Sequence, residues 1–175
     1  MNDIKIEDNF LSFREFEKIE DLFKPNKGWS GPILWSLGPI DNRTTDDYQL
    51  THMHYHAPSG LTGINTIDSR ENQRLLPMFL VKIQPRALVR IKSNLIMRTH
   101  EIIKHHFHQD FADYYDGLTT SIYYINSNDG YTEFKDGTII ESVANRLVSF
   151  PHHMQHRGTT CTDKPFRLVI NFNYF

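Results

Sequence analysis

The chain has 175 residues and a formal net charge of -2 at pH 7, and its length is enough for one domain, 1–175, with a buried core. The absence of lysine or arginine runs argues against a nucleic-acid surface. The apolar runs are too short to span a membrane, and the first residues lack the basic and apolar regions of a signal peptide. A single cysteine, Cys161, leaves no intramolecular disulfide. We therefore expect a soluble, cytoplasmic protein.

Residues 1–85 are expected to hold N-terminal helices and supporting strands. Apolar residues recur at helical spacing in residues 11–23, which predicts an amphipathic helix that ends before Pro25. A similar pattern in residues 69–83 predicts a second helix that continues through Pro77. The other elements expected in this half are a short strand with turns at 29–39, a polar loop at 41–47 and a strand at 48–56.

Three histidines alternate along the strand expected at residues 48–56. His52, His54 and His56 would share one face of that strand, because side chains alternate across a sheet. One interpretation is a metal site of three histidines. We favour the other, in which they are ordinary polar residues, because nothing nearby supplies hydrogen-bonding partners that would orient metal ligands.

Residues 86–175 are expected to form a β-rich core. In the strand expected at 87–97, Arg90, Lys92 and Asn94 share one face, which either lines a polar cleft or meets solvent. Further strands are expected at 118–126, 131–134, 138–143, 146–150 and 166–175. Many short antiparallel strands after N-terminal helices predict a mostly β fold, a double-stranded β-helix (the cupin-like jelly roll) backed by those helices.

A histidine and an aspartate stand two residues apart in His108-Gln109-Asp110. On an extended segment these two side chains point to the same side and are within reach of one metal ion. A second histidine from a distant strand would complete a two-histidine, one-carboxylate triad, which suits non-haem Fe(II) and leaves three coordination positions open. His156 is our candidate for that histidine.

Arg167 lies in the otherwise apolar segment 166–175. Alternation places it on the same face as Val169 and Asn171, and an unpaired guanidinium inside a barrel would be costly. An anionic ligand is one partner that would satisfy it, ideally a carboxylate bound through two hydrogen bonds. A salt bridge to a protein carboxylate, or a solvated edge position, are the alternatives.

Further motifs follow the His-x-Asp pattern in a fixed order. They are Ser121-Ile122-Tyr123-Tyr124-Ile125-Asn126, Gly130-Tyr131-Thr132-Glu133-Phe134, Asn145-Arg146-Leu147-Val148-Ser149-Phe150-Pro151, His156-Arg157-Gly158 and the Arg167 strand. This ordered set, over about residues 86–175, resembles the 2-oxoglutarate/Fe(II)-dependent oxygenases, specifically the prolyl-hydroxylase-like branch. The chain looks like the small stand-alone members that marine bacteriophages carry.

The resemblance implies an iron site. His108, Asp110 and His156 would hold Fe(II), while 2-oxoglutarate and O2 take the open positions and ascorbate serves as a reductant. Only His108 has an aspartate two residues on, and the Phe150-Pro151 pair sets the family's spacing to His156. The competing histidines are His106, His152 and His153.

The resemblance also implies a cosubstrate pocket. Arg167 would bind the distal carboxylate of 2-oxoglutarate. Tyr124 matches the position whose phenol hydrogen-bonds this cosubstrate, and Asn94 is a further candidate for the pocket wall. Because His108 follows the strand at 87–97 after one loop, we expect the polar face of that strand to line the mouth of the site.

The implied reaction is oxidative decarboxylation of 2-oxoglutarate to succinate and CO2, coupled to hydroxylation of a C–H bond. The expected substrate is a prolyl residue in a peptide or protein, or a free amino acid or other small molecule, and the expected state is a monomer or weak homodimer. A phage-encoded protein would act in the cytoplasm of the host bacterium. The alternatives are a cupin-like isomerase or small-molecule binding module, and an inactive relative used as a structural module in a virion.

Overall fold

The computed structural model describes residues 4–23, 33–40, 48–57, 70–111 and 116–175. The polar loop expected at 41–47 lies outside the described residues. The helices and strands are, in chain order, β1 (Lys5–Glu7), α1 (Phe13–Phe23), β2 (Ser36–Pro39), β3 (Tyr48–His56), α2 (Arg70–Ile83), β4 (Leu88–Met97), β5 (Thr119–Tyr124), β6 (Tyr131–Phe134), β7 (Ile139–Glu141), β8 (Arg146–Pro151), β9 (His156–Gly158) and β10 (Phe166–Tyr174).

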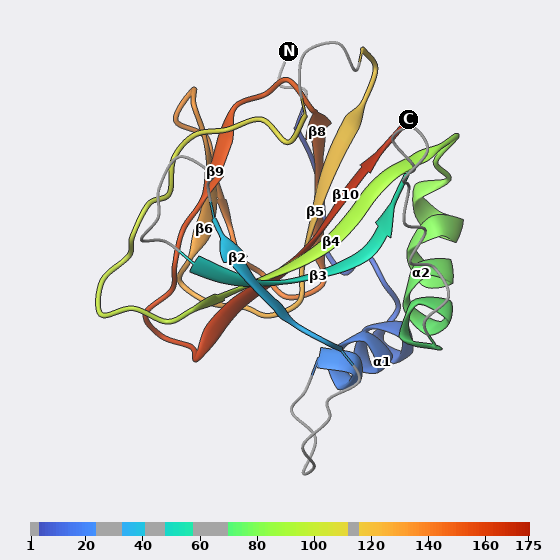
Figure 1. Ribbon diagram of the computed structural model, residues 1–175, viewed down its shortest axis with the longest axis horizontal. Coiled ribbons are helices and arrows are strands. Elements are labelled where there is room, and N and C mark those ends of the chain that lie inside the picture. The colour runs from blue at the N-terminus through green and yellow to red at the C-terminus, as the bar shows by residue number, and fades with distance from the viewer. Residues whose placement is uncertain (1–3, 24–32, 41–47, 58–69, 112–115) are drawn as a thin grey trace.

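The strands form two antiparallel sheets, and both helices lie on the outer side of the larger one (Figure 1). The larger sheet has the order β1-β8-β5-β10-β4-β3-β2, and the smaller sheet has the order β7-β6-β9. Strands from the first and second halves of the chain therefore share the larger sheet. The expected mostly β jelly roll backed by helices is confirmed.

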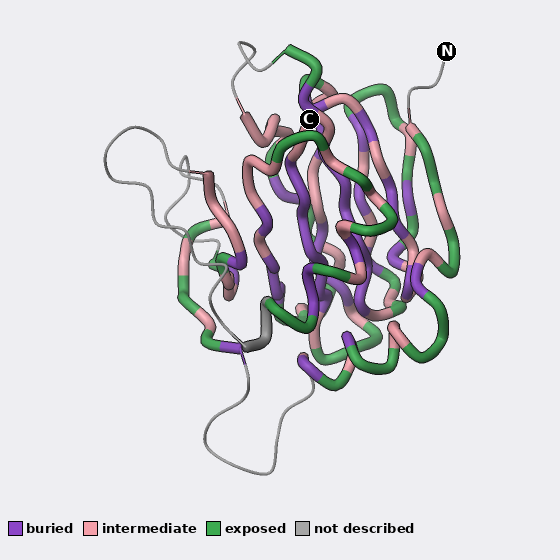
Figure 2. The backbone as a smooth tube through the Cα atoms, turned by 90° about the vertical axis from the view of Figure 1, so that its right-hand side faces the viewer, coloured by how far each residue is buried: buried purple, intermediate pink, exposed green. Residues whose placement is uncertain are grey.

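Strand β10 shows how alternation divides the core into two layers. Leu168 and Ile170 pack with the helices on the outer face of the larger sheet, in the larger apolar cluster. Val169 faces the other way, into a second apolar cluster between the two sheets. Arg167 and Asn171 share this inner face, as alternation predicted. The buried backbone accordingly runs through the middle of the strands (Figure 2).

The helices begin and end at residues whose local chemistry explains the boundary. Ser12 caps α1, because its backbone N–H and its hydroxyl both donate to the Glu15 carboxylate, at 2.9 and 2.7 Å. Helix α2 continues through Pro77, as expected, and is followed by Gln84 in the left-handed conformation at φ 50. Neither helix of the described part of the chain is long and apolar enough to cross a membrane.

The expectation that His52, His54 and His56 share one face is wrong, because β3 contains a bulge between Met53 and Tyr55. His52 pairs with Ser93 and His56 pairs with Arg90, so these two histidines lie on opposite faces of the sheet. His54 is buried in the bulge with its Nε2 2.7 Å from the Ser93 hydroxyl. These are ordinary polar interactions, which is the interpretation that the sequence favoured.

Asn145 ties the start of α1 to the sheet, and Asn145→Ala is expected to destabilise the fold by about 2–4 kcal/mol. Its side-chain oxygen accepts from the Leu11 backbone N–H and the Tyr123 hydroxyl, while its amide donates to the Leu11 carbonyl, each at 2.8 Å. Alanine would leave these buried groups without partners and would also have to adopt the positive φ of 62. Urea unfolding measures the loss.

Asn9→Ala is the matched control for this prediction. Asn9 also has a positive φ, of 53, but its side chain is exposed. It therefore reports the backbone contribution without the buried hydrogen bonds. If both variants lose the same free energy of unfolding, the hydrogen bonds of Asn145 contribute nothing.

Candidate metal centre and cosubstrate pocket

His108 and His156 are brought together by backbone pairing. The irregular segment 103–108 runs antiparallel to residues 156–160 and extends the smaller sheet beyond β9. His108 and His156 exchange two backbone hydrogen bonds, of 2.9 and 3.0 Å, so they are a directly opposed pair and project to the same side. Their ring centroids are 4.8 Å apart. Two histidines 48 positions apart in sequence are therefore held by the sheet itself.

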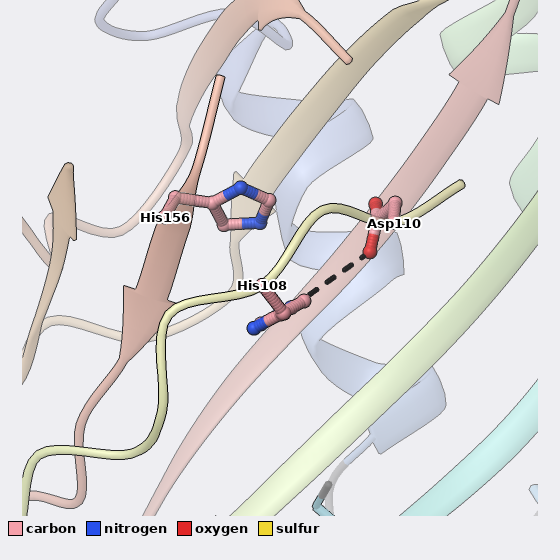
Figure 3. A group of neighbouring side chains, drawn as sticks. All are labelled: His108, Asp110 and His156. Atoms are coloured by element: carbon pink, nitrogen blue, oxygen red, sulfur yellow. Dashed lines mark ion pairs between the residues drawn. The ribbon is translucent and has the colours of Figure 1, made fainter. Parts of the chain in front are cut away.

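Asp110 completes the group, since it lies on the same segment as His108 and faces the two imidazoles (Figure 3). One ligand atom from each of the three side chains lies within 4.8 Å of the others, which is close enough for one ion to bind all three. Among the described residues this is the one group of at least three such side chains. The structure thus brings together the three residues that the sequence selected.

The Asp110 carboxylate is oriented by two neighbours from the larger sheet. Arg90 on β4 approaches one carboxylate oxygen at 3.1 Å, and the Asn173 amide on β10 donates to the other at 2.8 Å. Arg90 also donates to the Asn173 side-chain oxygen at 3.1 Å, which closes a ring of three interactions. Such outer contacts fix a ligand's direction before the metal arrives. The sequence pattern placed Arg90 on the polar face of its strand without giving it this role, and it did not single out Asn173.

Both histidines present the same nitrogen to the cavity. Nδ1 of His108 lies 3.2 Å from the His106 carbonyl, and Nδ1 of His156 lies 3.1 Å from the Met154 carbonyl. A carbonyl can only accept, so Nδ1 carries the proton in each ring and Nε2 keeps its lone pair for a ligand. This tautomer is the one that a metal site requires.

The charge states of the buried ligands also suit a cation. Burial lowers the pKa of His156 to about 4, although the Asp110 carboxylate opposes the shift, so the ring is neutral at neutral pH. Burial alone would raise the pKa of Asp110, but the Arg90 charge and the hydrogen bond from Asn173 outweigh it and hold that pKa well below its usual value. Neutral imidazole with ionised carboxylate is the state that binds a metal without first losing protons.

A cavity opens between the two sheets beside these three side chains. Its walls come from both sheets and from the segment that carries His108. The residues that line it include Lys92, Asn94, Thr132, Gly158, Arg167 and Asn171.

Arg167 reaches this cavity as a buried cation, with only 3% of its surface exposed. Its Nε donates to the Ser142 hydroxyl at 2.9 Å and its Nη2 to the Thr132 hydroxyl at 3.0 Å. No carboxylate in the described part of the chain lies within ion-pair distance of it, and burial lowers its pKa. The guanidinium is therefore positioned by neutral groups and has no anionic partner among the described residues. A Cβ at Gly158 would lie 3.3 Å from its Nη1, so this glycine keeps the approach open.

Tyr124 lies behind the cavity wall, and Thr132 stands in front of it. The Tyr124 hydroxyl donates to Thr132 Oγ1 at 2.8 Å, and the Arg167 guanidinium carbon lies 5.6 Å from the Tyr124 ring centre. The hydrogen bond predicted from Tyr124 to the cosubstrate therefore stays a prediction. Thr132 Oγ1 accepts from both Tyr124 and Arg167, which leaves its own proton free to donate into the cavity. Thr132 belongs to one of the sequence motifs, but the sequence predicted no role for it.

The segment that carries His108 is also fastened by charged side chains. Glu133 on β6 pairs with Lys104 at 3.1 Å and with Arg157 at 3.0 Å. The Arg157 guanidinium lies 4.1 Å from the centre of the Phe107 ring. These contacts hold residues 104–107 against β6 and β9, next to the ligand pair.

The competing histidines occupy other environments. The side chain of His106 is exposed, and only its carbonyl meets His108. His152 is buried against the His153 ring and does not belong to the group of potential ligands. The choice between neighbouring histidines in the sequence therefore agrees with the geometry.

The sequence of this chain matches no family model and no curated protein. Its fold, in contrast, matches solved structures. A prolyl hydroxylase from Trichoplax adhaerens, solved with an oxygen degradation domain peptide of hypoxia inducible factor, superposes with a TM-score of 0.66 at 14% identity, over 100% of this chain and 84% of that chain. An oxidoreductase of the 2OG-Fe(II) oxygenase family from Burkholderia pseudomallei gives 0.64 at 11% identity, over 98% and 84%. The non-haem alpha ketoglutarate dependent epimerase SnoN from nogalamycin biosynthesis gives 0.64 at 10% identity, over 99% and 76%.

At these identities the comparison establishes the fold. The chain has the double-stranded β-helix of the 2-oxoglutarate/Fe(II) oxygenases, a set that includes prolyl hydroxylases. In its cavity stand two histidines and an aspartate arranged as a candidate iron-binding triad.

Proposed function

We propose that this protein is a 2-oxoglutarate- and Fe(II)-dependent oxygenase that hydroxylates a C–H bond. The observation that carries the proposal is the buried guanidinium of Arg167, which opens on the same cavity as His108, Asp110 and His156. A buried cation that no described carboxylate neutralises is expensive unless an anionic ligand pairs with it. A simple metal-binding jelly roll, such as a cupin-like isomerase, gives that arginine no purpose.

The residues of the chain would divide the work as follows. The triad would hold Fe(II) through two neutral imidazoles and one carboxylate and leave three positions open. Arg167 would pair with the distal carboxylate of 2-oxoglutarate, and the free proton of Thr132 would donate to it. When bound, iron, 2-oxoglutarate and O2 supply oxidative decarboxylation to succinate and CO2 and the oxidant for the substrate.

For the substrate we propose a prolyl residue in a peptide or protein, or a free amino acid. The motif resemblance to prolyl-hydroxylase-like enzymes supports this choice, as does the fold shared with a prolyl hydroxylase. We also propose a phage source and action in the host cytoplasm, and the reason is the likeness in sequence to small stand-alone members that bacteriophages carry. The fold is shared with an epimerase as well, so the product has to be identified and not only counted.

The test is succinate release from purified protein with Fe(II), 2-oxoglutarate, O2 and ascorbate, across a panel of peptides and amino acids. The expected result is a basal rate without substrate that rises with the correct one, together with a product heavier by one oxygen atom. A protein that binds Fe(II) but releases no succinate above a metal-free control would support the cupin-like alternative instead.

Asn94→Ala is expected to lower turnover at least tenfold while the free energy of unfolding changes by less than about 1 kcal/mol. Asn94 lines the cavity, and its side-chain oxygen has no hydrogen-bond partner in the described protein. Removing that oxygen therefore breaks no hydrogen bond within the protein, but it takes away a contact for the ligand. Steady-state succinate release and urea unfolding are the two measurements. A variant that loses stability but keeps its turnover would give Asn94 a structural role.

A further inference from the structure

Lys92 is a second cation in the cavity. It lies on β4 between Asn171 of β10 and Met53 of β3, and its side chain is half-buried on the cavity wall. Burial lowers the pKa of Lys92, and the neighbouring Arg90 charge lowers it further, while Asp110 opposes the shift. No hydrogen bond or ion pair joins its ammonium group to any described residue. The half-buried ammonium group therefore relies on water, which an anionic ligand in the cavity would replace with an ion pair.

The other cations near the cavity are accounted for, Arg90 by protein groups and Arg167 by the proposed cosubstrate. Arg90 shares the face of Lys92 but is committed to Asp110 and Asn173, and it stacks on the Phe111 ring at 4.7 Å. In the proposed function Arg167 pairs with one carboxylate of 2-oxoglutarate, and the metal balances the other. Lys92 is therefore the cation left without an anion when metal and cosubstrate are both bound.

Two buried amides flank Lys92. Asn94 follows it on the same face of β4, and Asn171 is its direct partner on β10. They are 7% and 9% exposed, both line the cavity, and the side-chain oxygen of each has no hydrogen-bond partner. A buried acceptor without a donor costs about 1–3 kcal/mol, so both oxygens favour a ligand that brings N–H or O–H groups. The wall thus offers one cation beside two acceptors.

We propose that Lys92 binds a free carboxylate of the substrate and that Asn94 and Asn171 accept hydrogen bonds from an amine or amide next to it. The proposal rests on the proposed oxygenase function and names its substrate class. A carboxylate beside a nitrogen donor is the chemistry of a free amino acid, proline included, or of a C-terminal residue other than proline, whose peptide nitrogen carries no hydrogen. A prolyl residue inside a peptide chain lacks that carboxylate and would leave Lys92 unpaired.

A carboxylate of 2-oxoglutarate is the other candidate anion for Lys92, and the register of the strands argues against its distal carboxylate. Arg167 pairs with Ile96 across the β4–β10 ladder, whereas Lys92 pairs with Asn171, four residues further along. Four residues of extended strand span roughly 13 Å, whereas the four carbon–carbon bonds of a five-carbon diacid span only about 5 Å. A diacid held by Arg167 at its distal end and by the metal at the other end therefore has no carboxylate left for Lys92.

The test measures binding and needs no turnover. Protein with Mn(II) in place of Fe(II) and saturating 2-oxoglutarate is titrated without O2, by calorimetry, with free amino acids and their carboxamides, starting from L-proline and L-prolinamide. A peptide ending in a free alanyl carboxylate, whose peptide nitrogen carries a hydrogen, is compared with its C-terminal amide. The proteins are the wild type, Lys92→Met, Lys92→Arg and the control Lys135→Met, which changes an exposed lysine on the β6–β7 turn.

In the wild type and the Lys135→Met control, at least one carboxylate is expected to bind about ten- to a hundredfold more tightly than its amide. Lys92→Met should abolish that preference and Lys92→Arg should largely restore it, with the affinity for 2-oxoglutarate unchanged in both. The proposal is overturned if no carboxylate binds, if Lys92→Met keeps the preference, or if it weakens 2-oxoglutarate instead. Failure of succinate release would sink the oxygenase function while this binding result still stood.

Discussion

His108→Ala, Asp110→Ala and His156→Ala are each expected to abolish stoichiometric Fe(II) binding. Each change removes one of the three potential ligands, and the remaining two cannot hold the ion against water at ordinary concentrations. The free energy of unfolding of the metal-free protein should change much less for His108, whose side chain is 38% exposed, than for the buried His156. Anaerobic metal titration of each variant measures the loss.

Two histidine variants serve as controls for this result. His106→Ala removes an exposed ring two residues from His108 and keeps the carbonyl that orients it, so full Fe(II) binding is expected. His54→Ala removes a buried ring bonded to Ser93, so it should lower stability without lowering the stoichiometry. Complete loss of metal from His54→Ala would move the site to β3.

The facing of the strands in the site could be predicted because alternation is a local property. Arg167 and Asn171 line the cavity and Ile91 packs towards the helices, as the period of two required. The same rule failed at His56, because a bulge in β3 shifts the register by one residue. Nothing in the alternating histidines signals that bulge, which depends on how β3 pairs with β4.

The interactions that orient the ligands could not be predicted, because they join residues that are remote in sequence. Arg90, Asp110 and Asn173 form their ring only when β4, the loop after it and β10 lie side by side. Short β1 and β9 were likewise not expected as strands, since three residues carry too little alternation and, unlike β7, neither follows a hairpin turn signal. Asn173 had one available signal, its place on the same face of β10 as Arg167.

Arg167→Met is expected to weaken 2-oxoglutarate binding more than a hundredfold while Fe(II) binding survives. A charge-assisted, bidentate pair in a buried pocket is worth about 3 kcal/mol or more, and methionine keeps the volume but loses the charge. Because no described carboxylate compensates the guanidinium, its removal should cost the ligand-free protein little stability. Thermal unfolding shows both effects, since 2-oxoglutarate with Mn(II) should raise the melting temperature of the wild type and not that of the variant.

Tyr124→Phe and Arg146→Ala bracket this result. Tyr124→Phe removes one hydroxyl that donates to Thr132 and keeps the ring beside Arg167, so it should cost only about 1 kcal/mol of 2-oxoglutarate affinity. Arg146 pairs with Asp8 and is not among the cavity-lining residues, so its loss should leave that affinity unchanged.

If Arg167→Met instead binds 2-oxoglutarate normally, the carboxylate must meet another cation. Lys92 is then the candidate, because Arg90 is held by Asp110, and Lys92 would become a cosubstrate residue rather than a substrate one.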